Sequence, residues 1–149
     1  SKNPVFVGAA LRALGEADDE VQLAHASALA SSADYALASI AIETIGLSSA
    51  DGREQALAGA LTHSDPAVVC LILSELVRLH GDRSREALAW AIEHPSREVR
   101  QHAAELLGLD GSEEARTLIR ARLVREDDPQ VKEALLLAPR SLRARPGGS

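Results

Sequence analysis

The 149-residue sequence contains very few aromatic side chains, with one Trp, one Tyr and one Phe. Because 46% of its residues are nonetheless apolar, its core must be built from Ala, Leu, Val and Ile. Ala and Leu have high helix propensities, so this composition favours closely packed helices. A chain of this length is the size of one domain and can bury a sizeable core.

Cysteine and long apolar runs are also scarce. The single cysteine, Cys70, cannot form an internal disulfide, which suits a reducing compartment. No stretch approaches the roughly 18–20 apolar residues of a membrane span, and the start SKNPVF lacks the features of a signal peptide. We therefore expect a cytoplasmic protein that does not bind membranes. The absence of methionine suggests that Ser1 follows a cleavage or that the chain is part of a longer protein.

Basic residues are fewer than acidic ones, with 16 Lys and Arg against 22 Asp and Glu. The net charge of −6 and the sequence pI of about 5.3 would on balance repel the phosphates of nucleic acids. We therefore expect no nucleic acid partner.

A short apolar phrase occurs four times at intervals of 31 residues, as ALRALG (10–15), AIETIG (41–46), ILSELV (72–77) and AAELLG (103–108). A second series of residues, all favoured at helix N-caps, keeps nearly the same period. Its members are Asn3, Asp34, Asp65, Ser96 and Asp128. The sequence thus predicts five equivalent helix starts.

Apolar residues follow these caps at fixed distances. In the helix after Asp65 they are Val68, Ile72 and Leu76, and the other helices repeat the pattern. Residues four apart share one face of a helix, so the pattern predicts a buried stripe.

Glycine follows the stripe at Gly15, Gly46 and Gly108, where it predicts a left-handed residue at each helix end. Val77 takes this place in the third helix, which we expect to continue towards Gly81.

Four other helices are expected between these five, at approximately 20–30, 53–62, 84–93 and 112–124. Helix pairs that repeat at a constant period stack on one another. We predict an all-α, right-handed α–α solenoid of about four and a half hairpins over residues 1–139. The predicted repeats lie near 1–15, 16–46, 47–79, 80–108 and 109–138, followed by a flexible tail or linker at 140–149.

The first predicted helix lacks a hairpin partner, and its apolar flank must be covered. A homodimer, a longer parent chain and a helix that tilts inward to cap the stack all remain open.

Three segments, SDPAVVCLILSELV, SREVRQHAAELLG and DDPQVKEALLLA, resemble the second helices of HEAT repeats. They are most similar to the short class found in phycobilisome-lyase repeats, since the period is below the ~40–47 residues of long HEAT units. The arginine that follows the valine in this family occurs only at Arg100, with Lys132 as a substitute. A continuous Asp–Arg ladder is therefore not expected. The resemblance implies a scaffold, an adaptor or a lyase subunit.

Histidines are candidate metal ligands and catalytic residues. Two of them, His63 and His94, occupy equivalent places before a cap. Stacked helices lie ~8–10 Å apart whereas zinc needs its nitrogens ~2 Å away, so we interpret both as turn residues. The sequence lacks the His-Glu pairs of HEAT-like deoxyhypusine hydroxylases and the basic, aromatic groove of HEAT-like DNA glycosylases. Cys70 has apolar neighbours, which oppose thiolate formation. We predict no catalytic residue, metal site or cofactor, and hence no enzyme.

The second helices of HEAT-like stacks line the concave side. We call the apolar residue three places after each cap the anchor; residues two and six places after each anchor point away from the stripe. We call this set the ridge, and its members are Arg12, Ser39, Glu43, Cys70, Ser74, Gln101 and Glu105. Glu43 and Glu105 favour a basic or donor-rich partner, although the row is also what the solvated side of a helix stack would show. We predict a non-catalytic protein-protein interaction scaffold or adaptor. The alternative, from resemblance alone, is a subunit of a bilin lyase or related protein-modifying enzyme.

Overall fold

The computed structural model of the protein describes residues 19–79 and 83–143, with side chains up to residue 138. All regular structure in these residues is helical, and the chain divides into two compact units, Ser1–Arg83 and Ser84–Ser149. The helices of the first unit are α2 (Asp19–Leu29), α3 (Tyr35–Leu47), α4 (Arg53–Gly59) with the 3₁₀ turn η1 (Ala60–Thr62), and α5 (Pro66–Arg78). Those of the second are α6 (Arg83–Ala91), α7 (Arg97–Asp110), α8 (Glu113–Leu123) and α9 (Pro129–Arg143).

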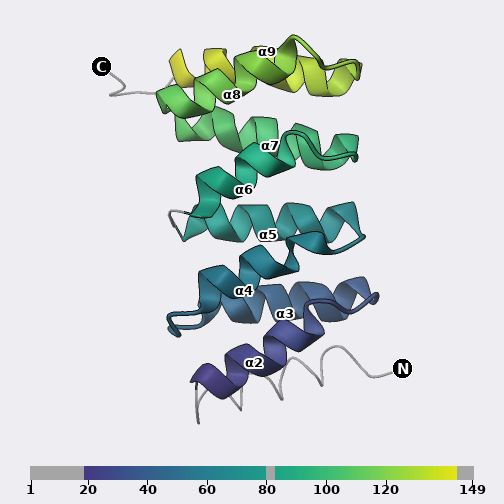
Figure 1. Ribbon diagram of the computed structural model, residues 1–149, viewed down its shortest axis with the longest axis vertical. Coiled ribbons are helices and arrows are strands. Elements are labelled where there is room, and N and C mark those ends of the chain that lie inside the picture. Colours follow the sequence, from purple (N-terminus) through teal and green to yellow (C-terminus); the bar gives the residue numbers. More distant parts are fainter. Residues whose placement is uncertain (1–18, 80–82, 144–149) are drawn as a thin grey trace. The chain divides into compact units, whose positions relative to one another are not determined.

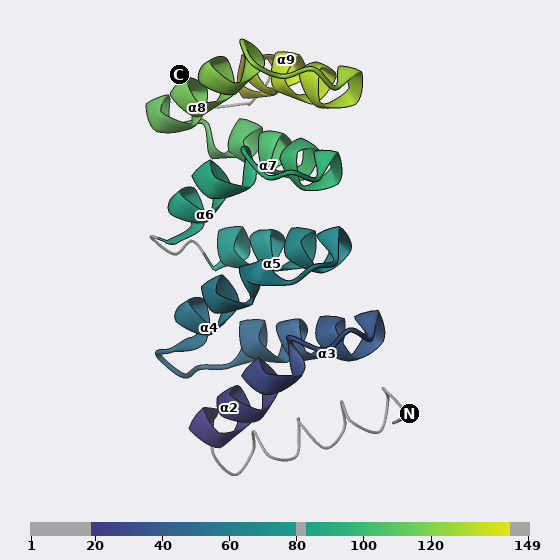
Figure 2. The ribbon, with the colours of Figure 1, turned by 45° about the vertical axis from the view of Figure 1, so that its right-hand side comes forward.

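Within each unit, equivalent second helices lie side by side and first helices cover one flank. In the first unit α3 packs against α2, α4 and α5, and in the second α7 packs against α9 while α8 contacts both (Figures 1 and 2). This is the hairpin stacking of an all-α solenoid, as the repeat period predicts. The right-handed course over residues 1–139 stays a prediction.

The predicted caps are confirmed wherever the structure describes them, and the predicted stripe is buried there except at Leu37, which is half-buried. Asp34, Asp65 and Asp128 accept backbone N–H groups of the following turn through their side chains, and Ser96 is the N-cap residue of α7 without a side-chain bond. The stripe residues Val68, Ile72, Leu76, Val99, Ala103, Leu107, Val131 and Leu135 are completely inaccessible to solvent. Asn3 lies outside the described residues.

The prediction that Gly46 and Gly108 end their helices in a left-handed conformation is wrong. Both glycines are buried inside helices, since α3 continues to Leu47 and α7 to Asp110. The left-handed residue that ends α7 is Gly111, with φ of 78°. Gly15 and Gly81 lie outside the described residues.

Close helix packing explains both glycines. A Cβ at Gly46 would lie 2.9 Å from the Cδ of Glu75 on α5, and one at Gly108 would lie 3.0 Å from the Cβ of Ala138 on α9. Each glycine therefore lets its helix approach the next equivalent helix in the same unit.

The C-terminal end of α9 is Arg143. The helix therefore includes the first residues of the segment 140–149, which the sequence predicts to be a tail or linker. Leu142 and Arg143 are good helix formers, and the helix-breaking Pro146 and glycines come later in the sequence.

A side chain two residues before each cap accepts the backbone N–H of that cap. The acceptors are Ser32 Oγ, His63 Nδ1, His94 Nδ1 and Glu126 Oε2, at 2.9–3.1 Å. The interpretation of His63 and His94 as turn residues is thus confirmed. These bonds fix the turns that enter α3, α5, α7 and α9.

Candidate protein-binding surface

The ridge residues of the first unit present small polar groups around one carboxylate. Glu43 on α3 is exposed, whereas Ser39, Cys70 and Ser74 are half-buried. The hydroxyl of Ser39 donates to the carbonyl of Ala36 in its own helix at 3.0 Å. Glu43 is therefore the ridge residue of this unit best placed to meet a charged partner. Arg12 lies outside the described residues.

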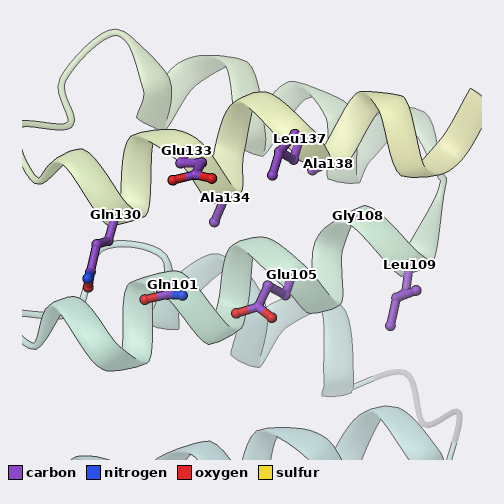
Figure 3. A pocket seen from close by; sticks show the side chains of 9 residues that line it. All are labelled: Gln101, Glu105, Gly108, Leu109, Gln130, Glu133, Ala134, Leu137 and Ala138. Atoms are coloured by element: carbon purple, nitrogen blue, oxygen red, sulfur yellow. The ribbon is translucent and has the colours of Figure 1, made fainter.

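The ridge residues of the second unit lie in a groove between α7 and α9 of about 560 Å³ (Figure 3). Gln101 is half-buried and Glu105 is exposed. The complete lining is Gln101, Glu105, Gly108, Leu109, Gln130, Glu133, Ala134, Leu137 and Ala138. The groove faces away from α8, which covers the opposite flank of the two helices.

Two lining residues follow the spacing rule that defines the ridge but are not among its predicted members. Glu133 and Leu137 stand two and six places after the buried anchor Val131, so extending the spacing to the fifth helix would have found them. Gly108 and Ala138 were not foreseeable in this way, because their role depends on the contact between α7 and α9.

The groove has a polar end and an apolar end. Gln101, Gln130 and Glu133 come from the early turns of α7 and α9, while Leu109 and Leu137 come from later turns (Figure 3). The two leucines are 55% and 44% exposed, so both present apolar surface to solvent. Gly108 and Ala138, which are in close contact with each other, complete this part of the lining.

The charge of the lining is negative, since it contains Glu105 and Glu133 and no basic side chain. Both carboxylates are exposed, and neither forms an ion pair with a residue whose side chain the structure describes. The negative charge of Glu105 also acts on His102. Burial lowers the pKa of His102, and the charge of Glu105 partly opposes this shift. A cation in the groove would therefore lie near two carboxylates that form no ion pair with the described side chains.

An ionic cluster holds α7 to the turn that enters α9. Arg100 on α7 donates through Nε and Nη2 to the two carboxylate oxygens of Glu126, at 2.9 and 3.0 Å. Arg122 donates to Glu126 at 2.9 Å, and the N–H of Asp128 does so at 3.0 Å. This cluster fixes the start of α9, and with it Gln130 and Glu133, relative to α7.

Glu126 is 2% exposed, and its ionisation depends on these donors. Burial raises its pKa, but the hydrogen bonds from Arg100, the Asp128 N–H and Arg122 outweigh this and bring the pKa to about 2. The pKa of His94 is lowered by burial and by the charge of Arg100. A neutral His94 keeps Nδ1 available to accept the Ser96 N–H.

Another depression, of about 540 Å³, lies in the first unit on the side of α2 and α4. Two of its polar side chains already have partners, because Ser27 Oγ donates to Leu23 O and His63 Nε2 bonds Ser32 O. We interpret this depression as part of the hairpin packing.

Within the residues that the structure describes, no group of three or more His, Cys, Asp and Glu side chains is arranged to hold a metal ion. No helix in the described segments is long and apolar enough to cross a membrane.

Comparison with protein families assigns the fold. The family model for HEAT repeats matches residues 54–139, which is more than half of the chain. The chain belongs to the HEAT repeat family. HEAT repeats are generally protein-interaction scaffolds and are typically not enzymes. The match does not distinguish subclasses, so the similarity to phycobilisome-lyase repeats stays a prediction, and a search of curated proteins finds no match.

Proposed function

We propose that this HEAT-repeat chain is a non-catalytic scaffold or adaptor that presents the ridge of its second helices to a protein with a basic or donor-rich surface. The observation that carries the proposal is the groove between α7 and α9. The ridge residues Gln101 and Glu105 of α7 line it together with Glu133 and Leu137, which occupy the equivalent positions on α9. Concave surfaces between packed helices are a common form of protein-binding site.

The charge of the surface supports this class of partner. Residues 19–79 contain eight acidic and two basic residues, and Glu43 is exposed on the ridge of that unit. In the other unit Glu105 and Glu133 are exposed as well. Complementary charge accelerates association and selects against partners of the same sign.

Affinity capture from the native host with the full chain tests the proposal. We expect one or more proteins to be retained by the parent chain and lost, by about tenfold or more, from a variant with Glu43→Lys and Glu105→Lys. The matched control is Asp51→Lys with Asp127→Lys, which reverses two exposed charges located in turns. Retention of the same partners by both variants would refute the ridge as the contact surface.

Two further observations would change the class of function. Turnover of a substrate by the purified chain alone would overturn the non-catalytic part of the proposal. A captured complex that carries the colour of a bound tetrapyrrole would favour the lyase-subunit alternative.

A further inference from the structure

We propose that the groove between α7 and α9 binds an extended segment of a partner protein in which Arg or Lys stands two residues from a leucine-sized apolar residue. This inference rests on the proposed scaffold function and specifies the chemistry of the ligand at one place on the ridge. The charge of the groove, the spacing of its residues and its small side chains each support the proposal.

Charge identifies the first requirement of the ligand. Glu105 and Glu133 project from different helices into the same groove (Figure 3). Their carboxylates are exposed and have no ion-pair partner among the described residues. A guanidinium or ammonium group placed between them gains from both carboxylates, whereas an acidic side chain would be repelled by both.

Apolar surface gives the second requirement. Leu137 lies four residues after Glu133 on α9, and Leu109 lies four residues after Glu105 on α7. Four residues of helix span ~6 Å. In an extended chain, side chains two residues apart project to the same side at ~6.6–6.8 Å. A basic residue and an apolar residue at positions i and i+2 therefore match the spacing of glutamate and leucine along either helix.

The remaining lining suits the backbone of such a segment. Gly108, Ala134 and Ala138 have small side chains, so a main chain can approach the two helices closely. The amides of Gln101 and Gln130 supply both donors and acceptors. An extended segment has N–H and C=O groups that need such partners, whereas a helical segment satisfies its own.

A displayed library of random heptapeptides, selected on the full chain, tests the inference without knowledge of the natural partner. We expect enriched peptides to contain Arg or Lys two residues from Leu, Ile, Met or Phe. Synthetic versions are then measured by fluorescence polarisation. The variant Glu105→Gln with Glu133→Gln should bind them about tenfold or more weakly, and Leu137→Ser should weaken them similarly.

The matched control is Glu114→Gln, which removes an exposed carboxylate from α8 on the opposite flank. It should change the affinity less than about twofold. Far-ultraviolet circular dichroism of each variant establishes that the helices are intact. All substituted side chains are exposed, so we expect each variant to fold.

Three outcomes would overturn the inference: no enrichment of basic peptides, equal binding to the parent chain and the double glutamine variant, or enrichment of an i, i+4 pattern that indicates a helical ligand. These outcomes are distinct from failure of the scaffold function. If native partners are lost from a single Glu43→Lys variant, which leaves the groove lining unchanged, while the glutamine variant has no effect, the scaffold function stands and this groove is not its peptide site.

Discussion

The two units join successive turns by different chemistry. In the first unit, His63 Nδ1 accepts the N–H of Asp65 at 3.0 Å, which leaves the proton on the other ring nitrogen. That nitrogen lies 2.7 Å from the carbonyl oxygen of Ser32, which occupies the equivalent turn one repeat earlier. One neutral side chain therefore connects two turns.

In the second unit the places equivalent to Ser32 and His63 of the first are taken by His94 and Glu126. The carboxylate of Glu126 accepts the N–H of Asp128 but cannot donate to the preceding turn. Arg100 supplies the missing donors. It gives two hydrogen bonds to Glu126 and a third, of 2.8 Å, to the carbonyl of His94 in the preceding turn. In both units a side chain thus links successive turns, through a neutral group in the first and through an ion pair in the second.

The choice of link agrees with the charge of each unit. Residues 19–79 contain two basic residues, and the ion pair described there is Arg78 with Glu75. Residues 84–138 contain eight basic residues, most of them in ion pairs. An ionic link is more costly to break, because removing one partner leaves a buried charge uncompensated. Each unit has its own fluorophore, Tyr35 in the first and Trp90 in the second, so the two can be followed separately.

The largest difference between the units should come from Arg100→Ala. The side chain of Glu126 is 1% exposed, and without Arg100 its charge loses two hydrogen bonds. We expect the second unit to lose about 3–5 kcal/mol of unfolding free energy, measured by urea denaturation with Trp90 fluorescence. Arg97→Ala is the control, because its 3.6 Å pair with Asp128 is at the surface and should contribute under about 1 kcal/mol. Equal effects of the two variants would contradict an ionic link at Arg100.

Acid should weaken the ionic link in a defined range. The pKa of Glu126 is about 2 in the folded chain against an ordinary value of 4.5, so the unfolded state binds a proton first as the pH falls. The stabilisation is complete above pH 4.5 and is lost as the pH falls towards about 2. The loss should be on the order of 3 kcal/mol, measured by urea denaturation at a series of pH values. Glu126→Gln cannot titrate, so the component due to this residue should be absent from its profile.

Much of the helical framework could be predicted from the sequence because it depends on local and periodic features. A cap such as Asp65 acts on its own first turn, and the stripe of Val68, Ile72 and Leu76 repeats at helical spacing. The links between turns could not be predicted in the same way. Glu126 looks like one more residue in the acidic run REDDP, and its burial becomes evident only once Arg100 on another helix is placed beside it.

The site was partly predictable for the same reason. Spacing alone identified Gln101 and Glu105, and the same rule extends to Glu133 and Leu137. The close approach of α7 and α9 beside the groove depends on Gly108 and its neighbour Ala138 on α9. A glycine near a helix end has two explanations, a left-handed cap and a close helix contact, and packing decides between them.

A moderate effect is expected where the link is neutral. His63→Ala removes the acceptor of the Asp65 N–H and the bond to Ser32, so the first unit should lose about 1–2 kcal/mol. His63→Asn can restore the first of these bonds, since Asn favours this kind of turn, and should recover part of the loss. His25→Ala, an exposed histidine on α2, is the control. Tyr35 fluorescence during urea denaturation provides the measurement, and a loss as large as that of Arg100→Ala would remove the distinction between the two links.

The smallest effect should separate the two buried glycines. Replacing glycine by alanine within a helix gains up to about 1 kcal/mol from propensity, so packing decides the net sign. At Gly46 the added Cβ meets the carboxylate of Glu75, the end of a flexible side chain that can move aside. At Gly108 it lies 3.2 Å from the Cα of Ala138, so the backbone of α9 must shift.

We therefore expect Gly46→Ala to change the stability of the first unit by less than about 0.5 kcal/mol. Gly108→Ala should destabilise the second unit by about 1 kcal/mol, because the strain of overpacking exceeds the gain in propensity. Urea denaturation followed by Tyr35 and Trp90 fluorescence compares the two variants. If both glycines tolerate alanine equally, α9 can move away from α7 at little cost in free energy. The width of the groove between the two helices would then not be fixed by the contact of Gly108 with Ala138.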